Sequence, residues 1–258
     1  MTLHDALPFE AMPFEDRGLL LGDGLFETLL AVDGGLPRLA AHLERMAAGC
    51  AVLGLPFDRD EAERLVRLAA PAAGRFAVRL TLTAGSGGRG LDRPAAPLPR
   101  LFATAAPSAP VTAPASAIVA AARRNEGSPA SRLKTLSYLD NVLARAEARA
   151  AGADEAVMLN NRGEIACAGA ANLFWIEGGR LFTPRLDCGA LAGITRARLM
   201  AAERVEAVAV GVEALDGAEA VFLTNSLIGL RPLSRLVTPL GERTYAPHRL
   251  VERYGVLF

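Results

Sequence analysis

The stretch SRLKTLSYLDNVLA, residues 131–144, contains Lys134, the only lysine in the 258-residue chain. Lys and Arg together number 28, so every other residue of this pair is an arginine. An arginine guanidinium stays protonated, whereas a lysine that is desolvated or set beside another cation readily loses its proton. Leu133 and Leu136 flank Lys134 just before an apolar run at helical spacing, which favours a partly buried position. The alternative is one lysine surviving by chance on a solvated helix face.

The chemistry that most needs a neutral lysine amine is imine formation with a carbonyl group, either a substrate's or that of pyridoxal phosphate (PLP). A PLP enzyme also needs a carboxylate that keeps the pyridine nitrogen protonated. Backbone amides, hydroxyls and an arginine must bind its phosphate. Candidates for these roles are Glu164 after the turn 160–163, Gly193-Ile194-Thr195 before a helical period, Arg45 in a helix, and Thr224-Asn225-Ser226 at a strand end. Each has a simpler interpretation, as a turn carboxylate in water, a helix N-cap, a solvated arginine or an ordinary turn.

The composition excludes several classes of function. The formal net charge is zero and the pI is about 6.9, so nothing suggests nucleic acid or a membrane surface as a partner. No apolar run reaches the roughly 18 residues of a spanning helix. Three cysteines without ligand spacing indicate reduced thiols in a cytoplasmic protein, and the scattered histidines indicate no metal site.

The periodicity of apolar residues predicts mixed strands and helices in both halves of the chain. The pattern indicates strands over 25–32 and 76–82, and helices over 39–53, 60–70 and 138–151. Residues 105–116 are rich in Pro, Ala and Ser and lack any period, which is typical of a linker. We therefore expect a smaller N-terminal α+β domain (1–109), a linker (110–120) and a larger C-terminal domain (121–258), a mixed α/β and α+β architecture of two lobes.

Six motifs in this order resemble the fold-type-IV PLP enzymes, the class IV aminotransferases and their relatives. They are GDGLFETL, HLER, LKTLSYLDNVLA, GEIACAGAANLFW, GITR and LTNS, and they span nearly the whole chain. The resemblance implies a two-lobed fold like that of D-amino-acid aminotransferase, with PLP bound between the domains. It implies that Lys134 forms the imine with PLP and that Glu164 contacts the pyridine nitrogen. It further implies that the phosphate is held by Arg45, Gly193, Ile194, Thr195, Asn225 and Ser226.

Within this family, the segments 85–91 and 170–196 look most like those of the 4-amino-4-deoxychorismate lyases. These enzymes of folate synthesis release pyruvate and p-aminobenzoate. The resemblance implies that Arg89, in the glycine-rich loop, clamps a substrate carboxylate and that Phe26 and Thr28 contact the small amino substrate. It also implies a homodimer, because in the family this loop can lie over the partner subunit's site.

Two departures keep other members of the family in consideration. Ser137 stands where the family usually has Asn, and Leu91 stands where the lyases carry an aromatic residue. The alternative activity is that of a class IV aminotransferase acting on a D-amino acid, a branched-chain L-amino acid or an amine. A third hypothesis is a cofactor-free binding protein that kept the fold, against which the single lysine and Glu164 argue.

Overall fold

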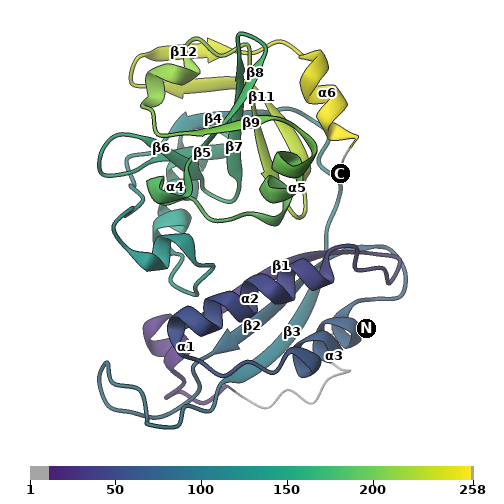
Figure 1. The fold of residues 1–258 in the computed structure, drawn as a ribbon, viewed down its shortest axis with the longest axis vertical. Coiled ribbons are helices and arrows are strands. Elements are labelled where there is room, and N and C mark those ends of the chain that lie inside the picture. The colour runs from purple at the N-terminus through teal and green to yellow at the C-terminus, as the bar shows by residue number, and fades with distance from the viewer. Residues whose placement is uncertain (1–11, 257–258) are drawn as a thin grey trace.

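The computed structural model describes residues 12–256, and its elements form two lobes, each built on its own sheet (Figure 1). The outer ends of the expected domains, residues 1–11 and 257–258, lie outside the described residues. The N-terminal lobe contains α1 (Arg17–Leu21), β1 (Gly24–Val32), α2 (Leu39–Leu53), α3 (Arg59–Ala69), β2 (Arg75–Thr83) and β3 (Arg100–Pro107). The C-terminal lobe contains β4 (Ala115–Val119), α4 (Leu139–Ala150), β5 (Glu155–Leu159), β6 (Ile165–Ala168), β7 (Asn172–Glu177), β8 (Arg180–Pro184), α5 (Ile194–Ala202), β9 (Val205–Val208), β10 (Ala220–Asn225), β11 (Gly229–Thr238), β12 (Gly241–Thr244) and α6 (Arg249–Gly255).

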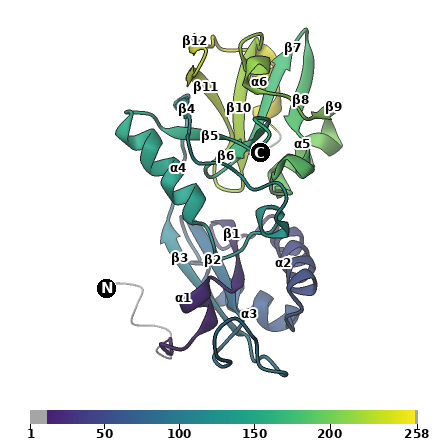
Figure 2. The ribbon, with the colours of Figure 1, turned by 90° about the vertical axis from the view of Figure 1, so that its left-hand side faces the viewer.

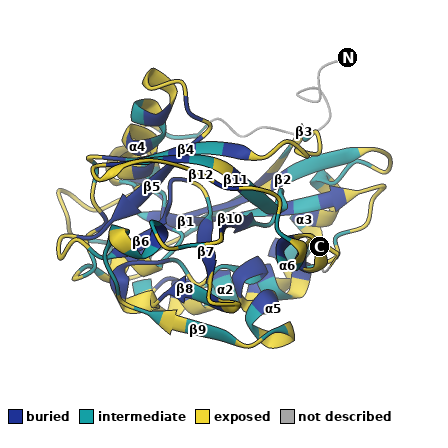
Figure 3. Cartoon of the chain, turned by 90° about the horizontal axis from the view of Figure 1, so that it is seen from above, coloured by how far each residue is buried: buried dark blue, intermediate teal, exposed yellow. Residues whose placement is uncertain are grey.

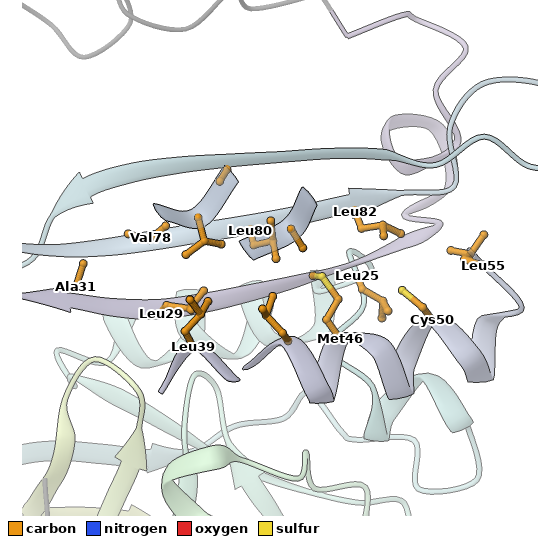
Figure 4. Close-up of a cluster of buried hydrophobic side chains, with 14 of the residues drawn as sticks. Leu25, Leu29, Ala31, Leu39, Met46, Cys50, Leu55, Val78, Leu80 and Leu82 are labelled. Atoms are coloured by element: carbon orange, nitrogen blue, oxygen red, sulfur yellow. The ribbon is translucent and has the colours of Figure 1, made fainter. Parts of the chain in front are cut away.

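The sheet of the N-terminal lobe is antiparallel, in the order β1-β2-β3. Successive side chains of a strand point to opposite faces, so each strand serves two environments. Leu25 and Leu29 of β1 belong to the apolar core between the sheet and the helices α2 and α3, where Met46 and Cys50 of α2 meet them (Figure 4). On the other face, Phe26 and Thr28 are free to line a site.

The C-terminal lobe contains a mixed sheet in the order β6-β5-β4-β11-β10-β7-β8-β9, with β12 paired to β11. The sheet curls until its two edges approach each other. The backbone amide of Ile165 in β6 donates to the carbonyl of Val210, just after β9, at 2.8 Å. The strand at one edge therefore meets the segment that follows the other edge. Helix α4 packs against β5, α5 against β10 and α6 against β11, and the buried residues follow the strands between them (Figure 3).

The lobes are joined by more than the chain crossing between β3 and β4. The backbone amide of Phe26 donates to the carbonyl of Lys134 at 2.9 Å, and the backbone amide of Leu136 donates to the carbonyl of Gly24 at 3.0 Å. The segment that carries Lys134 therefore runs along the edge of β1, with α4 starting directly after it (Figure 2). The C-terminal lobe thus presents the lysine at the boundary with the N-terminal lobe.

The helices and strands expected from periodicity are confirmed to within two residues at each end. The expected linker over 110–120 differs in detail, since 115–119 form β4, a strand of the large sheet paired with β5 and β11. The stretch that connects the two sheets is 108–114. All five residues of this short segment are small or β-branched, which suits a buried strand, but the prolines that precede it obscure this signal.

Candidate active site

A cavity of about 600 Å³ lies between the lobes and brings most of the expected site residues together. This volume is within the range of roughly 300 to 1,000 Å³ that is usual for small-molecule sites. Nine residues proposed from the sequence line it: Phe26, Thr28, Arg45, Lys134, Gly193, Ile194, Thr195, Asn225 and Ser226. Glu164 and Arg89 do not.

Lys134 reaches the cavity among aromatic rings. Its Nζ lies 4.2 Å from the centroid of the Phe26 ring and 5.3 Å from that of Tyr138. Burial lowers the pKa of Lys134 from 10.5 to about 8, with the positive charges of Arg45 and Arg79 acting in the same direction. The neutral, nucleophilic amine is therefore accessible close to neutral pH.

A buried network supports the wall beside the lysine. Glu27 projects from β1 and accepts two hydrogen bonds from Arg45, at 2.7 and 2.6 Å, and one from Nδ1 of His42 at 2.6 Å. Burial raises the pKa of Glu27, but the hydrogen bonds from Arg45 and His42 outweigh it and lower that pKa overall. The other ring nitrogen of His42, Nε2, lies 3.3 Å from the Ser226 hydroxyl, so the network reaches the C-terminal lobe. These contacts fix Arg45 where the lobes meet.

The cavity end formed by α5 and the end of β10 suits an anion. Ile194 and Thr195 open α5, and the amides of a first helical turn have no partner within the helix. The Thr224 hydroxyl is buried without a hydrogen-bond partner among the described residues, and Ser226 adds a second hydroxyl. A buried donor left without a partner costs free energy, so a ligand oxygen here would satisfy it. We call residues 193–195 and 224–226, with Arg45, the anion end.

Glu164 lies elsewhere, which corrects the expectation drawn for it. It immediately precedes β6, at the edge where the sheet closes on residues 210–211, and its carboxylate accepts from Asn160 and Arg162. These hydrogen bonds lower its pKa. The residues of this strand that line the cavity are at its other end, beginning with Cys167, about 10 Å farther along. Glu164 is therefore not placed to face a ring inside the cavity.

The wall that follows β6 is formed by residues not anticipated from the sequence. Cys167, Arg124 and Asn141 line it and are each over 90% buried. Nη1 of Arg124 donates to Oδ1 of Asn141 at 3.0 Å, and Nδ2 of Asn141 donates to the carbonyl of Gly169 at 2.8 Å. Burial raises the pKa of the Cys167 thiol to about 11. We call these three residues the thiol wall. No local signal distinguished them, because a buried cysteine in an apolar strand looks like an ordinary core residue.

Arg89 is exposed in the loop that connects β2 and β3, and it does not reach the cavity of its own chain. Its role as a substrate clamp stays a prediction that concerns a second subunit. In its own chain, the loop is held by Arg17, which donates to the carbonyls of Leu91 and Asp92 at 2.8 and 3.0 Å.

The arrangement matches two of the three requirements of PLP. The anion end provides amides, hydroxyls and an arginine for a phosphate. Lys134 provides an amine in another part of the same cavity. The third requirement, a carboxylate for the ring nitrogen, is not met, since no acidic residue of the described chain lines the cavity. The residues present therefore fit the cofactor's phosphate and carbonyl, and they leave its ring nitrogen without a carboxylate.

Comparison with known proteins agrees with this geometry. A protein of Methanocaldococcus jannaschii named "Putative branched-chain-amino-acid aminotransferase" is 32% identical over 84% of the chain and 80% of its own length. The aminodeoxychorismate lyase of Vibrio harveyi is 27% identical over 96% of both chains. The 4-amino-4-deoxychorismate lyase of Pseudomonas aeruginosa, a solved structure, superimposes with a TM-score of 0.84 at 30% identity, covering 97% of this chain and 95% of its own. Residues 24–236 match the family "Amino-transferase class IV". With the lysine and anion end in place between two lobes of this fold, the chain belongs to the class IV amino-transferase family, whose cofactor is PLP.

Proposed function

We propose that the protein is a 4-amino-4-deoxychorismate lyase, which forms p-aminobenzoate and pyruvate. The observation that carries the proposal is the charge of the cavity. Five cationic residues line it and no acidic residue of the described chain does: Arg45, Arg124, Lys134, Arg145 and Arg149. The proposed substrate has two carboxylates, and the cofactor adds a phosphate. A cavity with this excess of positive charge suits these three anionic groups better than the two of an aminotransferase with a monocarboxylic amino acid.

Two of these arginines are already neutralised by carboxylates behind the cavity. Arg45 is paired with Glu27, and Arg145 lies 2.9 Å from Glu155. Arg124 and Arg149 have no carboxylate within ion-pair distance in the described chain. Arg124 is held by hydrogen bonds to Asn141, Ser131 and Gly189, so Arg149 is the arginine whose guanidinium is available to a substrate carboxylate.

The residues of the chain can divide the chemistry between them. PLP, when bound, supplies the electron-withdrawing group that makes the bond cleavage accessible. The amine of Lys134 is placed to take the proton from the substrate carbon that bears the amino group. The enolpyruvyl oxygen on the neighbouring carbon then leaves with its electron pair, and the departing group takes up a proton to become pyruvate. The remaining ring becomes aromatic, so no amino acceptor is consumed.

The relatives support both this activity and an alternative. Two lyases are similar to the chain over nearly its whole length. The relative from M. jannaschii, at 32% identity, carries the name of a branched-chain aminotransferase. Apolar residues in the cavity, including Phe26, Val142 and Leu227, favour an aliphatic side chain in that case. The alternative is therefore a class IV aminotransferase acting on a branched-chain L-amino acid, a D-amino acid or an amine.

A homodimer is part of the proposal. Exposed apolar side chains gather on two helices that lie on one side of the molecule: Leu19, Leu20 and Leu21 on α1, and Leu139, Val142 and Leu143 on α4 (Figure 2). The Ser137 hydroxyl, just before α4, donates to the carbonyl of Gly22, just after α1, so the two helices adjoin. An exposed apolar surface of this kind favours association. A partner placed there would also lie beside the mouth of the cavity, which Val142 lines.

The deciding experiment supplies the purified, PLP-loaded enzyme with enzymatically generated aminodeoxychorismate and no keto acid. We expect repeated, stoichiometric release of pyruvate and p-aminobenzoate. An aminotransferase would stop after one half-reaction without an acceptor. No products, together with 2-oxoglutarate- or pyruvate-dependent deamination of D-alanine or L-leucine, would establish the aminotransferase instead. An Arg149→Gln variant should raise KM for the lyase substrate, and Arg132→Gln, outside the cavity, is the matched control.

A further inference from the structure

The thiol wall occupies the part of the cavity where a PLP enzyme needs a partner for the pyridine nitrogen. In PLP, the ring nitrogen is opposite the carbon that bears the aldehyde, and the phosphate arm is on the carbon next to that one. With the aldehyde carbon at Lys134 and the phosphate at the anion end, the ring nitrogen is directed away from both. Of the polar side chains that line the remaining wall, Asn141 already uses both ends of its amide, toward Arg124 and Gly169.

Arg124 also has a hydrogen bond from each of its three nitrogen atoms. Its three nitrogen atoms donate to Asn141, to the carbonyl of Ser131 and to the carbonyl of Gly189, and its side chain is held rigidly. Its charge nevertheless acts on the wall, because it opposes the rise in the pKa of the Cys167 thiol that burial causes. The sulfur of Cys167 makes no hydrogen bond to any described residue. Among the three residues of the thiol wall, the thiol is therefore the polar group without a hydrogen-bond partner, and it lies beside a buried cation.

We infer that the ring nitrogen of bound PLP faces the Cys167 thiol beside Arg124 and that it is unprotonated at neutral pH. Protonation would place a positive charge near the guanidinium without a carboxylate to compensate it, which is unfavourable in a buried site. A neutral thiol is a weak donor, so it can donate its hydrogen to an unprotonated ring nitrogen. Burial keeps the thiol neutral, since its pKa is raised to about 11.

This inference deepens the proposed function and rests on it for its consequence. An unprotonated ring withdraws electrons more weakly, so the cofactor stabilises charge on the substrate less effectively. Elimination to p-aminobenzoate is helped by the aromaticity of its product, whereas amino transfer between simple amino acids gains nothing comparable. A thiol in place of a carboxylate is therefore tolerable for the lyase and costly for an aminotransferase.

The protonation state can be measured without turnover. The enzyme is loaded with PLP that carries ¹⁵N in the ring, and the ¹⁵N resonance is recorded at pH 7 by NMR. We expect the resonance of an unprotonated ring nitrogen in the wild type and in Cys167→Ser. In Cys167→Glu we expect it to move to the protonated position, because a carboxylate then faces the ring. Cys188→Ser, a buried cysteine that does not line the cavity, should match the wild type.

A protonated resonance in the wild type would overturn the inference, whatever the variants do. If Cys167→Glu does not fold, Cys167→Asp places a shorter carboxylate at the same position and tests the placement separately. Its ring ¹⁵N resonance should also move to the protonated position. A wild-type resonance in folded Cys167→Asp would place the ring nitrogen elsewhere. The lyase assay is independent of both measurements, so an unprotonated ring in an enzyme without lyase activity would remove the proposed function and leave the inference standing.

Discussion

The anion end and the thiol wall enclose the same cavity but are built from different physical components. The anion end uses backbone amides at the start of α5 and the hydroxyls of Thr224 and Ser226. The amides are fixed by the helix start and depend on no single side chain, and each hydroxyl contributes one hydrogen bond at most. The thiol wall depends on three buried side chains, Arg124, Asn141 and Cys167. Its charge comes from Arg124 alone, so the replacement of that residue would change it.

The two regions have different effects on the reaction: the anion end binds the cofactor, and the thiol wall influences which bond is broken. An anion bound by helix amides is held in the same way for any reaction that the cofactor serves. A group that faces the ring sets how strongly the ring withdraws electrons, and so affects the kind of bond that is broken. The anion end therefore serves the cofactor in any such reaction, whereas the thiol wall bears on which reaction the cofactor carries out.

Lys134 lies between the two regions, and its removal has the largest expected effect. Lys134→Ala should abolish turnover and the imine that borohydride reduces, because no other lysine exists in the chain. Mass spectrometry of the reduced protein should locate the PLP adduct on Lys134 in the wild type only. Arg132→Ala, an exposed change two residues away, is the control and should keep both properties. A reducible and active Lys134→Ala protein would contradict the assignment.

The pH dependence of PLP capture tests the environment of the same lysine. Since the pKa of Lys134 is about 8 rather than 10.5, the neutral amine predominates above pH 8 and declines below it. The rate of imine formation in the apoenzyme, followed by absorbance, should therefore fall about tenfold per pH unit below pH 8. Arg79→Ala removes one of the cations that lower this pKa and should move the profile to higher pH. A rate that rises steadily to pH 10 would show that the lysine is not desolvated.

The contribution of one hydroxyl to the anion end should be modest. Ser226→Ala removes a hydroxyl that lines the cavity beside Thr224 and approaches His42. A hydrogen bond to a charged group contributes about 1.5 kcal/mol, so the Kd for PLP should rise about tenfold. An absorbance titration with PLP measures this. Ser234→Ala, the same change at an exposed position of β11, should leave the Kd as it is in the wild type.

The sequence predicted the anion end better than the thiol wall for a physical reason. Helix starts and strand ends have local signatures, so Gly193–Thr195 and Asn225 could be located without knowing what lies opposite them. Glu27 also had a signal that passed unnoticed, since a carboxylate between Leu25 and Leu29 on a buried strand face must find a cation. His42 and Arg45, one helical turn apart on α2, are its partners.

The thiol wall had no such signature, because it assembles from three separate segments of the chain. Arg124 follows β4, Asn141 lies in α4 and Cys167 lies near the end of β6; they come together because β4, β5 and β6 are neighbours in the large sheet and α4 packs against β5. In the sequence, Glu164 is the acidic residue next to this strand. It lies three residues before Cys167, and this distance places it at the end of β6 that is away from the cavity. The connection between the two lobes is another example: the composition predicts it at 110–120, whereas the structure has it at 108–114.

Glu164→Gln has the smallest expected effect. It tests whether the ring nitrogen faces the thiol wall or, as the family resemblance implies, Glu164. Glu164→Gln keeps an oxygen acceptor for Asn160 and Arg162 at a position outside the cavity, so stability should change by only about 0.5 kcal/mol. Turnover and the ¹⁵N resonance of the ring should match those of the wild type, because this carboxylate does not face the cofactor. Cys167→Glu, three residues along the chain, should shift that resonance. Parallel measurements on both variants compare a carboxylate removed at one end of β6 with one introduced at the other. A severe loss of turnover in Glu164→Gln, with a changed ring resonance, would return the ring nitrogen to Glu164 and remove the contrast between the two ends of the cavity.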